Sequence, residues 1–211
     1  MKVYKGNKLI DISYGEFAAI KERYTRIEVD LGTGDGQFVY KMASTQPKTL
    51  VIGIDPAIKQ VENFSRKCAR NHIDNVLYVV GSIEILPKDL IGVADYLTVV
   101  LPWGTLLESI VNANSANMQN LKSLLKPEAN FMFVLGYSHE LEQSETQRLQ
   151  LPTLNLDYLE NQLTPKLCQL GFKNVTITML TKTDLENLDS TWGKRVKETK
   201  DRMLFKITGN V

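Results

Sequence analysis

The chain has 211 residues, 43% of them hydrophobic, and a formal net charge of +1. This length and apolar content suit a single α/β domain with one sizeable core. The near-neutral charge excludes a uniformly basic nucleic-acid binder, so any contact with nucleic acid has to come from local patches. The two histidines and two cysteines do not form a metal-binding motif.

The cellular compartment follows from what the chain lacks. It shows neither the apolar segment of a signal peptide nor a run of about 18 apolar residues. Cys68 and Cys168 lie far apart and form no C-x-x-C motif, which is typical of reduced thiols. We therefore expect a cytoplasmic protein that does not bind membranes.

The N-terminal residues 1–12 are predicted to form a small β-hairpin that extends the main fold. Two short apolar segments flank Gly6-Asn7, a common two-residue turn. Ser13 and Glu16 then have the spacing of a capping box, which predicts a helix that continues to about Lys21.

A glycine turn follows the first buried strand, which is predicted at Arg26–Leu31. Glycines stand at positions 32, 34 and 36, and a helix is expected to follow as far as about Ser44. Glycine permits a positive φ and a close approach of the backbone to a ligand. A dinucleotide fingerprint requires its third glycine at position 37, which is Gln37. The acid Asp30 before the turn favours a ligand with a cationic amino group over a pyrophosphate.

The second strand, 50–55, ends in Asp55. In folds of this kind an acid about 20 residues beyond the glycine turn binds ribose hydroxyls. Together Asp30, the glycine turn and Asp55 resemble the first two motifs of the class I S-adenosylmethionine (SAM) methyltransferases.

The helix predicted over residues 57–71 has an apolar side and a basic side. Arg66, Lys67 and Arg70 fall roughly opposite the apolar residues. The sequence leaves two interpretations open, a solvated helix face or a patch that contacts phosphates.

Two further strands lead to loops at the ligand side of the sheet. The strand 76–80 precedes Ile83 and Glu84. In this fold class the loop after that strand passes the adenine ring of the cofactor. The apolar strand 94–101 runs into the segment 101–105, which reads Leu-Pro-Trp-Gly-Thr. Because ligands of open α/β sheets lie beyond the carboxyl ends of the strands, we interpret Trp103 as a residue that stacks on substrate; a hydrophobic lid is the alternative.

The C-terminal part completes the sheet. A helix is expected at about 115–125, and a strand at 130–136 after Pro127. The polar segment 137–152 is predicted to contain a helical insertion, because long structureless loops are uncommon. A helix from about Leu156 to Gly171 follows, interrupted or restarted at Pro165. An antiparallel pair of strands, 174–180 and 203–207, comes after it. The predicted fold is an α/β, Rossmann-like class I methyltransferase with a seven-stranded mixed sheet, a C-terminal antiparallel hairpin and the N-terminal β-hairpin extension.

The connection between the last two strands combines an aromatic residue with cations. Trp192 precedes residues 194–202, which contain five cations and two acids. Aromatic side chains beside Lys and Arg hold unstacked bases and their phosphates. We therefore expect two substrate-binding linkers, 137–152 and 181–202, within one domain that covers 1–211.

These motifs resemble one family along almost the whole chain. The segments 30–36, 53–56, 101–108 and 190–195 are similar to those of the aminoglycoside-resistance 16S rRNA (adenine-N1) methyltransferases. The resemblance implies SAM-dependent methylation of N1 of adenine 1408 in the assembled 30S ribosomal subunit, by an enzyme that we expect to be a monomer. Methylation of this base would weaken the aminoglycosides that contact it.

The resemblance also implies roles for individual residues. The SAM pocket would be lined by Asp30, Gly32, Gly34, Asp55, Ile83, Glu84, Leu101, Thr105 and Ser190. The catalytic pair Trp103 and Trp192 would hold the flipped adenine between them. The rRNA phosphates would contact Arg66, Lys67, Arg70, Arg195, Lys200 and Arg202. Two positions depart from the family pattern: Leu101 replaces a phenylalanine, and Lys200 replaces an arginine and so lacks its bidentate fork.

No catalytic base is expected, because N1 of a flipped adenine has a free lone pair and no proton to lose. Positioning is then the main task of the enzyme. Three alternatives remain: another RNA methyltransferase such as a tRNA guanine-N7 enzyme, a small-molecule methyltransferase, and a SAM-binding RNA module that does not catalyse transfer. Paired tryptophans and basic patches favour the rRNA enzyme over the first two.

Overall fold

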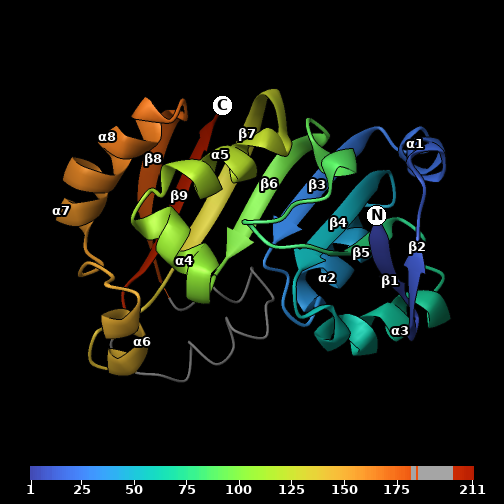
Figure 1. Ribbon diagram of the computed structural model, residues 1–211, viewed down its shortest axis with the longest axis horizontal. Coiled ribbons are helices and arrows are strands. Elements are labelled where there is room, and N and C mark those ends of the chain that lie inside the picture. Colours follow the sequence, from blue (N-terminus) through green and yellow to red (C-terminus); the bar gives the residue numbers. More distant parts are fainter. Residues whose placement is uncertain (182–183, 185–201) are drawn as a thin grey trace.

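The computed structural model describes residues 1–181, 184 and 202–211; residues 182–183 and 185–201 lie outside this description. The described strands form one mixed sheet in the order β2-β1-β5-β4-β3-β6-β7-β9-β8 (Figure 1). Its strands are β1 (Lys2–Lys5), β2 (Lys8–Asp11), β3 (Arg26–Leu31), β4 (Thr49–Asp55), β5 (Val76–Val80), β6 (Ala94–Val100), β7 (Leu125–Leu135), β8 (Lys173–Leu180) and β9 (Leu204–Asn210). The helical segments are α1 (Tyr14–Lys21), α2 (Gln37–Thr45), η1 (Ile58–Val61), α3 (Glu62–Arg70), η2 (Lys88–Leu90), α4 (Gly104–Val111), α5 (Ser115–Ser123), α6 (Gln143–Arg148), α7 (Leu156–Tyr158), η3 (Leu159–Leu163) and α8 (Thr164–Gln169).

The centre of the sheet is parallel, as predicted. Strands β5, β4, β3, β6 and β7 run in one direction, and β9 lies antiparallel between β7 and β8. The strands β3 to β9 are therefore the seven-stranded sheet and C-terminal antiparallel hairpin that the sequence predicted. Parallel strands place their carboxyl ends on the same edge, where ligands of such sheets bind.

The N-terminal hairpin is more than an extension, because it joins the main sheet. Strand β1 pairs antiparallel with β5 through Val3↔Val79 and Tyr4↔Tyr78. Val3 and Tyr4 are buried, and the Tyr4 hydroxyl donates a hydrogen bond of 3.0 Å to Glu62 on α3. The hairpin thereby covers an edge of β5 that would otherwise expose unpaired backbone groups, and the sheet has two strands more than the seven predicted.

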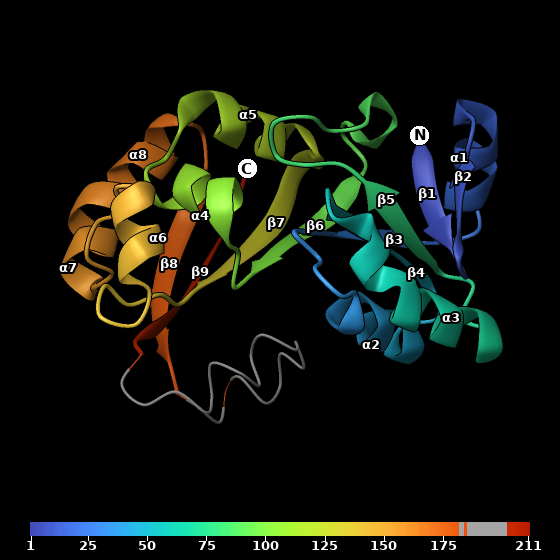
Figure 2. The same ribbon diagram turned by 60° about the horizontal axis from the view of Figure 1, so that its bottom comes forward.

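Helices cover both faces of the sheet (Figure 2). On one face, α2, η1 and α3 pack through residues such as Val39, Val61 and Phe64. On the other face, α1, α4, α5 and the α7–α8 region pack through residues such as Phe17 and Ile110. This burial from both sides explains why β4 is buried along its whole length.

Helix α1 begins with the predicted capping box. The Ser13 hydroxyl accepts from the Glu16 N–H, and the Glu16 carboxylate accepts from the Ser13 N–H at 2.8 Å. The reciprocal bonds satisfy amide groups that have no partner within the first helical turn.

Of two prolines in the C-terminal half, Pro127 differs from the prediction and Pro165 agrees with it. Pro127 lies inside β7 and not before it. The strand tolerates a residue without an N–H there, because the pairing with β6 is irregular between Ala94↔Leu125 and Tyr96↔Asn130. The predicted interruption or restart of the helix at Pro165 is confirmed, because η3 ends at Leu163 and α8 begins at Thr164 with this proline in its first turn. The π-helical turn η3 precedes it, and this wider turn accommodates a proline that lacks the N–H of a regular turn.

The polar linker 137–152 contains the helix α6, which confirms the predicted insertion. Its two ends are tied together, since the Tyr137 hydroxyl donates a hydrogen bond of 2.6 Å to the carbonyl of Pro152. The linker is therefore a closed loop with a fixed base.

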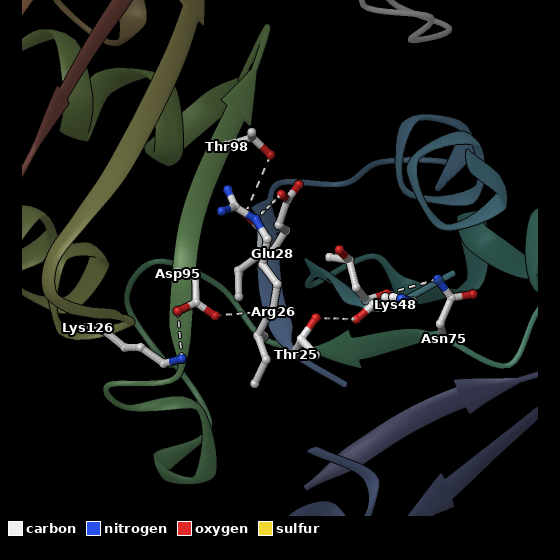
Figure 3. Close-up of polar contacts among 11 residues, drawn as sticks. Thr25, Arg26, Glu28, Lys48, Asn75, Asp95, Thr98 and Lys126 are labelled. Atoms are coloured by element: carbon white, nitrogen blue, oxygen red, sulfur yellow. Dashed lines mark hydrogen bonds and ion pairs between the residues drawn. The ribbon is translucent and has the colours of Figure 1, made fainter. Parts of the chain in front are cut away.

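A polar network joins the strands near their amino ends (Figure 3). One carboxylate oxygen of Asp95 on β6 accepts from Lys126 at 2.7 Å, and the other accepts from the Ile27 N–H at 2.8 Å. Arg26 donates to the buried Glu28 at 2.6 Å. The charges at this end of the sheet are thus paired with one another.

Candidate functional site

The glycine turn after β3 shapes the floor of a cleft. Gly32, Gly34 and Gly36 all have positive φ values, between 56° and 80°. A Cβ atom on Gly32 would meet the Leu106 side chain at 2.6 Å, and one on Gly36 would meet the Tyr78 ring at 2.6 Å, whereas nothing lies within 4 Å of one on Gly34. The backbone at Gly34 is consequently open to a ligand.

Asp55 is held in place by this turn. One of its carboxylate oxygens accepts from the Gly34 N–H at 2.9 Å, and the other accepts from the Ala57 N–H at 2.8 Å. Burial raises the pKa of Asp55, while the two backbone hydrogen bonds act in the opposite direction. Each oxygen keeps a lone pair for a ligand hydroxyl.

Asp30 is a buried carboxyl without a basic partner among its described contacts. It is 3% exposed and accepts a hydrogen bond of 2.8 Å from Thr98. Burial raises its pKa to about 6, although the hydrogen bond from the Thr98 hydroxyl opposes the shift. A carboxyl in this state gains strongly from a ligand cation.

Glu84 lies on the opposite wall, in the loop after β5. Burial would raise the pKa of its carboxyl, but hydrogen bonds from Ser82, from its own N–H and from Thr105 lower it. Thr105, in the first turn of α4, lines the same cleft. Ile83 beside it is 2% exposed.

The loop between β6 and α4 holds Trp103 over the cleft. Leu101 adopts a left-handed conformation with φ 49°, which is strained for a branched side chain. Its side chain packs with Val100, Val134 and Leu204. The sharp bend turns the chain away from β6, and Trp103 remains 43% exposed just before α4.

The cleft has a volume of about 750 Å³, within the range of small-molecule sites. All predicted cofactor residues that the structure describes line it, and so does Trp103. Sequence reasoning did not predict several other lining residues, among them Thr33, Phe38, Gln60 and Ser82. Thr33 and Ser82 are neighbours of predicted residues and Phe38 is an aromatic residue just after the turn, but Gln60 carries no local signal.

The cleft lining is acidic. It contains the carboxylates Asp30, Asp35, Asp55 and Glu84, and none of its described residues is Lys, Arg or His. Such a lining favours a ligand with a positive charge and disfavours a pyrophosphate. The part of the chain that the structure describes contains no group of His, Cys, Asp and Glu side chains that could hold a metal ion.

The predicted RNA contacts on α3 are accessible to different degrees. Arg66 is 60% exposed at its side chain, although it also forms an ion pair with Glu62. Arg70 is exposed. Lys67 lies with its ammonium group 4.5 Å from the centre of the Phe64 ring. The interpretation as a phosphate patch and the interpretation as a solvated face both agree with this geometry.

Arg202 does not lie as predicted. We expected it to contact rRNA phosphates, but its side chain is 7% exposed and forms an ion pair with Glu142. It also donates a hydrogen bond of 3.3 Å to the carbonyl of Gly136. The charge is turned inward because Glu142, in the linker 137–152, supplies a partly buried carboxylate. Arg202 therefore joins this linker to the start of β9.

Four predicted residues lie outside the described part of the chain: Trp192, Ser190, Arg195 and Lys200. The roles expected for them remain predictions. No helix within the described residues is both long and apolar enough to cross a membrane.

The comparison with known proteins agrees with the site. The family model of the 16S rRNA (adenine(1408)-N(1))-methyltransferases matches residues 2–211. A protein of that name from Escherichia coli is 34% identical over 216 residues, which cover 100% of this chain and 99% of the relative.

Two crystal structures are also similar over their full length. A 30S ribosomal adenine-1408 methyltransferase from an uncultured bacterium is 38% identical with a TM-score of 0.78, and 99% of this chain and 98% of that chain are covered. A variant of the 16S rRNA (adenine(1408)-N(1))-methyltransferase from Catenulisporales acidiphilia, with cosubstrate SAM, is 29% identical with a TM-score of 0.89, over 100% and 96% of the chains. This chain therefore belongs to the family of 16S rRNA (adenine(1408)-N(1))-methyltransferases.

Proposed function

We propose that this chain transfers a methyl group from SAM to N1 of adenine 1408 in 16S rRNA of the assembled 30S subunit. The observation that supports this most strongly is the acidic cleft at the carboxyl ends of β3 to β6, with Trp103 at its edge. SAM is a sulfonium cation that also carries an ammonium group, and it supplies the methyl group to a nucleophile. The cleft offers carboxylates to both its cationic part and its ribose, so the residues fit this ligand.

Each wall of the cleft has its own task in this proposal. Asp30 attracts the ammonium group, and the open backbone at Gly34 lets the ligand approach the turn. Asp55, fixed by two backbone N–H groups, accepts from the ribose hydroxyls. Ile83 and Glu84 face the adenine base of the cofactor, and Leu101, Thr105 and Ser190 complete the pocket.

The target base is held by aromatic side chains. Trp103 and Trp192 stack on either side of the flipped adenine, and stacking of about 1–3 kcal/mol per base offsets a flipping cost of a few kcal/mol. The N1 lone pair attacks the methyl carbon as the bond from carbon to sulfur breaks, and the methylated ring becomes cationic. Aromatic faces favour such a cation, so the enzyme needs position and orientation and no general base.

The ribosome is bound by cations around the cleft. Arg66, Lys67 and Arg70 on α3, together with Arg195 and Lys200, contact rRNA phosphates. Arg202 acts from the interior, since its ion pair with Glu142 holds the linker 137–152 against β9. The linkers 137–152 and 181–202 bind substrate within one domain that covers 1–211. The protein works as a monomer in the cytoplasm and confers resistance to aminoglycosides that contact adenine 1408.

The deciding experiment is methyl transfer from labelled SAM to purified 30S subunits, to naked 16S rRNA and to tRNA. Label at N1 of adenine 1408 on 30S subunits is expected, and it is mapped by the reverse-transcription stop that a blocked pairing edge causes. Label on tRNA would instead indicate another RNA methyltransferase. No label on any RNA, with SAM still bound, would remove the rRNA assignment and leave a SAM-binding module.

Variants of the two tryptophans and of the RNA contacts should affect different quantities in the same assay. Trp103→Ala and Trp192→Ala should each reduce turnover sharply while the affinity for SAM stays nearly unchanged. Arg195→Ala should mainly weaken binding to the 30S subunit. Full activity in both tryptophan variants would exclude the stacking model.

A further inference from the structure

Asn120 reaches the adenine wall of the cleft from behind. It lies on α5, and its side-chain amide donates a hydrogen bond of 3.1 Å from Nδ2 to the main-chain carbonyl of Ile83. Ile83 and Glu84 line the cleft, whereas none of the described lining residues comes from α5. Asn120 therefore touches the loop that forms the wall without touching the ligand space.

The loop itself is short and tightly turned. Ser82 and Ile85 exchange two backbone hydrogen bonds of 3.1 Å, and Gly81 is anchored to the carbonyl of Asp55 at 3.3 Å. These bonds fix the ends of the loop. The peptide between Ile83 and Glu84 lies at its tip, and the bond from Asn120 holds the carbonyl of that peptide.

The orientation of this peptide decides what the cleft offers to a base. The structure has no cis peptide among its described residues, and in a trans peptide the C=O and N–H groups point in opposite directions. Since the Ile83 carbonyl points to α5, the Glu84 N–H points away from α5. The Glu84 side chain belongs to the same residue as this N–H, and Glu84 lines the cleft, so a donor and an acceptor are both available on the cleft side of the peptide.

A donor beside an acceptor is complementary to the pairing edge of adenine, which presents the acceptor N1 beside the donor N6 amino group. Hypoxanthine presents the reverse order at neutral pH, with a protonated N1 and the acceptor O6. We propose that Asn120 is a positioning residue that makes the cofactor site selective for adenine, by holding the peptide 83–84 with its N–H toward the base. This inference rests on the proposed placement of the SAM adenine against Ile83 and Glu84.

The test compares two ligands on each variant by calorimetry: S-adenosylhomocysteine and S-inosylhomocysteine. The native protein should bind the adenosyl compound more tightly by at least about tenfold. In the inosyl compound the N1–H donor would face the Glu84 N–H, and the O6 acceptor would face the Glu84 carboxylate. Asn120→Leu removes the donor at nearly the same size, and Asn120→Asp places an acceptor against the carbonyl. Each variant should reduce the ratio of the two affinities by about fivefold or more, mainly because it binds the adenosyl compound more weakly.

The matched control is Asn117→Leu on the same helix. Asn117 donates to Ser109 at 2.8 Å, and none of its described hydrogen bonds reaches the loop, so this variant loses a similar hydrogen bond and should keep the native ratio. Thermal unfolding of all variants shows that they are folded. A native ratio in both Asn120 variants would overturn the inference. Equal binding of the two ligands by the native protein would also overturn it, and would additionally show that the adenine does not lie against Glu84.

Discussion

Asp30 and Asp95 occupy opposite ends of the same sheet and face opposite surroundings. Asp95, near the amino end of β6, accepts hydrogen bonds from Lys126 and from the Ile27 N–H (Figure 3). Asp30, near the carboxyl end of β3, accepts from the hydroxyl of Thr98. One carboxylate has its counter-charge within the protein, and the other is left to receive one from a ligand.

The pKa values of the two side chains record this difference. Burial would raise the pKa of Asp95, but hydrogen bonds from Lys126 and Ile27 and the charges of Lys126 and Arg26 lower it overall. Burial dominates at Asp30 and raises its pKa to about 6. A paired carboxylate stabilises the fold, whereas a buried carboxyl without a counter-charge costs stability and is kept for binding.

The largest expected effect is on cofactor affinity. Asp30→Asn removes the charge but keeps an oxygen that can accept from Thr98, so the fold should lose no stability. We expect the Kd for SAM to rise by about 100-fold, or close to 3 kcal/mol, because a charge-assisted hydrogen bond in a buried site is lost. Calorimetry and urea unfolding measure the two quantities. A variant that loses stability and keeps its SAM affinity would reverse the assignment of Asp30.

The pH dependence of stability should have opposite signs at the two sites. The pKa of Asp30 is raised in the folded state to about 6 from 3.8. Its contribution to stability is therefore fully present below pH 4 and is lost as the pH rises through about 6. Relative to Asp30→Asn, the native protein should lose about 2 kcal/mol between pH 4 and pH 7.

The lowered pKa of Asp95 predicts the reverse. Its stabilising contribution is present above about pH 4 and is lost as the pH falls through its lowered pKa. Urea unfolding of the native protein, Asp30→Asn and Asp95→Asn across pH 3 to 7 separates the two curves. Parallel curves for the two variants would show that the sites do not differ as described.

At neutral pH, Asp95→Asn should affect the fold and leave the cofactor site unchanged. It weakens the bonds to Lys126 and Ile27, and we expect a loss of about 1–2 kcal/mol in the free energy of unfolding. The Kd for SAM should remain within about twofold, since Asp95 lies at the other end of β3 and β6. A large change in this Kd, with unchanged stability, would contradict the division of the sheet into a structural end and a binding end.

The cofactor site was more predictable from the sequence than the edges of the fold. The glycine turn, Asp30 and Asp55 were recognised because a strand, a turn and a helix follow one another within a short segment, and local patterns determine them. The pairing of β1 with β5 joins Tyr4 to Tyr78, and the ion pair of Arg202 joins it to Glu142. No local pattern encodes contacts between residues so far apart, so the sheet edge and the inward turn of Arg202 were missed.

The smallest effects come from exposed ion pairs, and they test how much of the structural end depends on charge. Lys126 and Lys173 each pair with a carboxylate, at 2.7 Å from Asp95 and 3.3 Å from Glu128. Asp95 is 28% exposed and Glu128 is 73% exposed at the side chain, and exposure screens an ion pair. Lys126→Met should therefore cost about 0.5–1 kcal/mol in unfolding free energy, and Lys173→Met about 0–0.3 kcal/mol.

Salt separates the two variants further. Raising the salt concentration to about 1 M should reduce the stability loss caused by Lys126→Met and leave the loss caused by Lys173→Met unchanged. If the two variants were equally destabilised, the charge pairs at the amino ends of the strands would contribute no more than any surface pair, and the stability of that end would rest on its backbone hydrogen bonds alone.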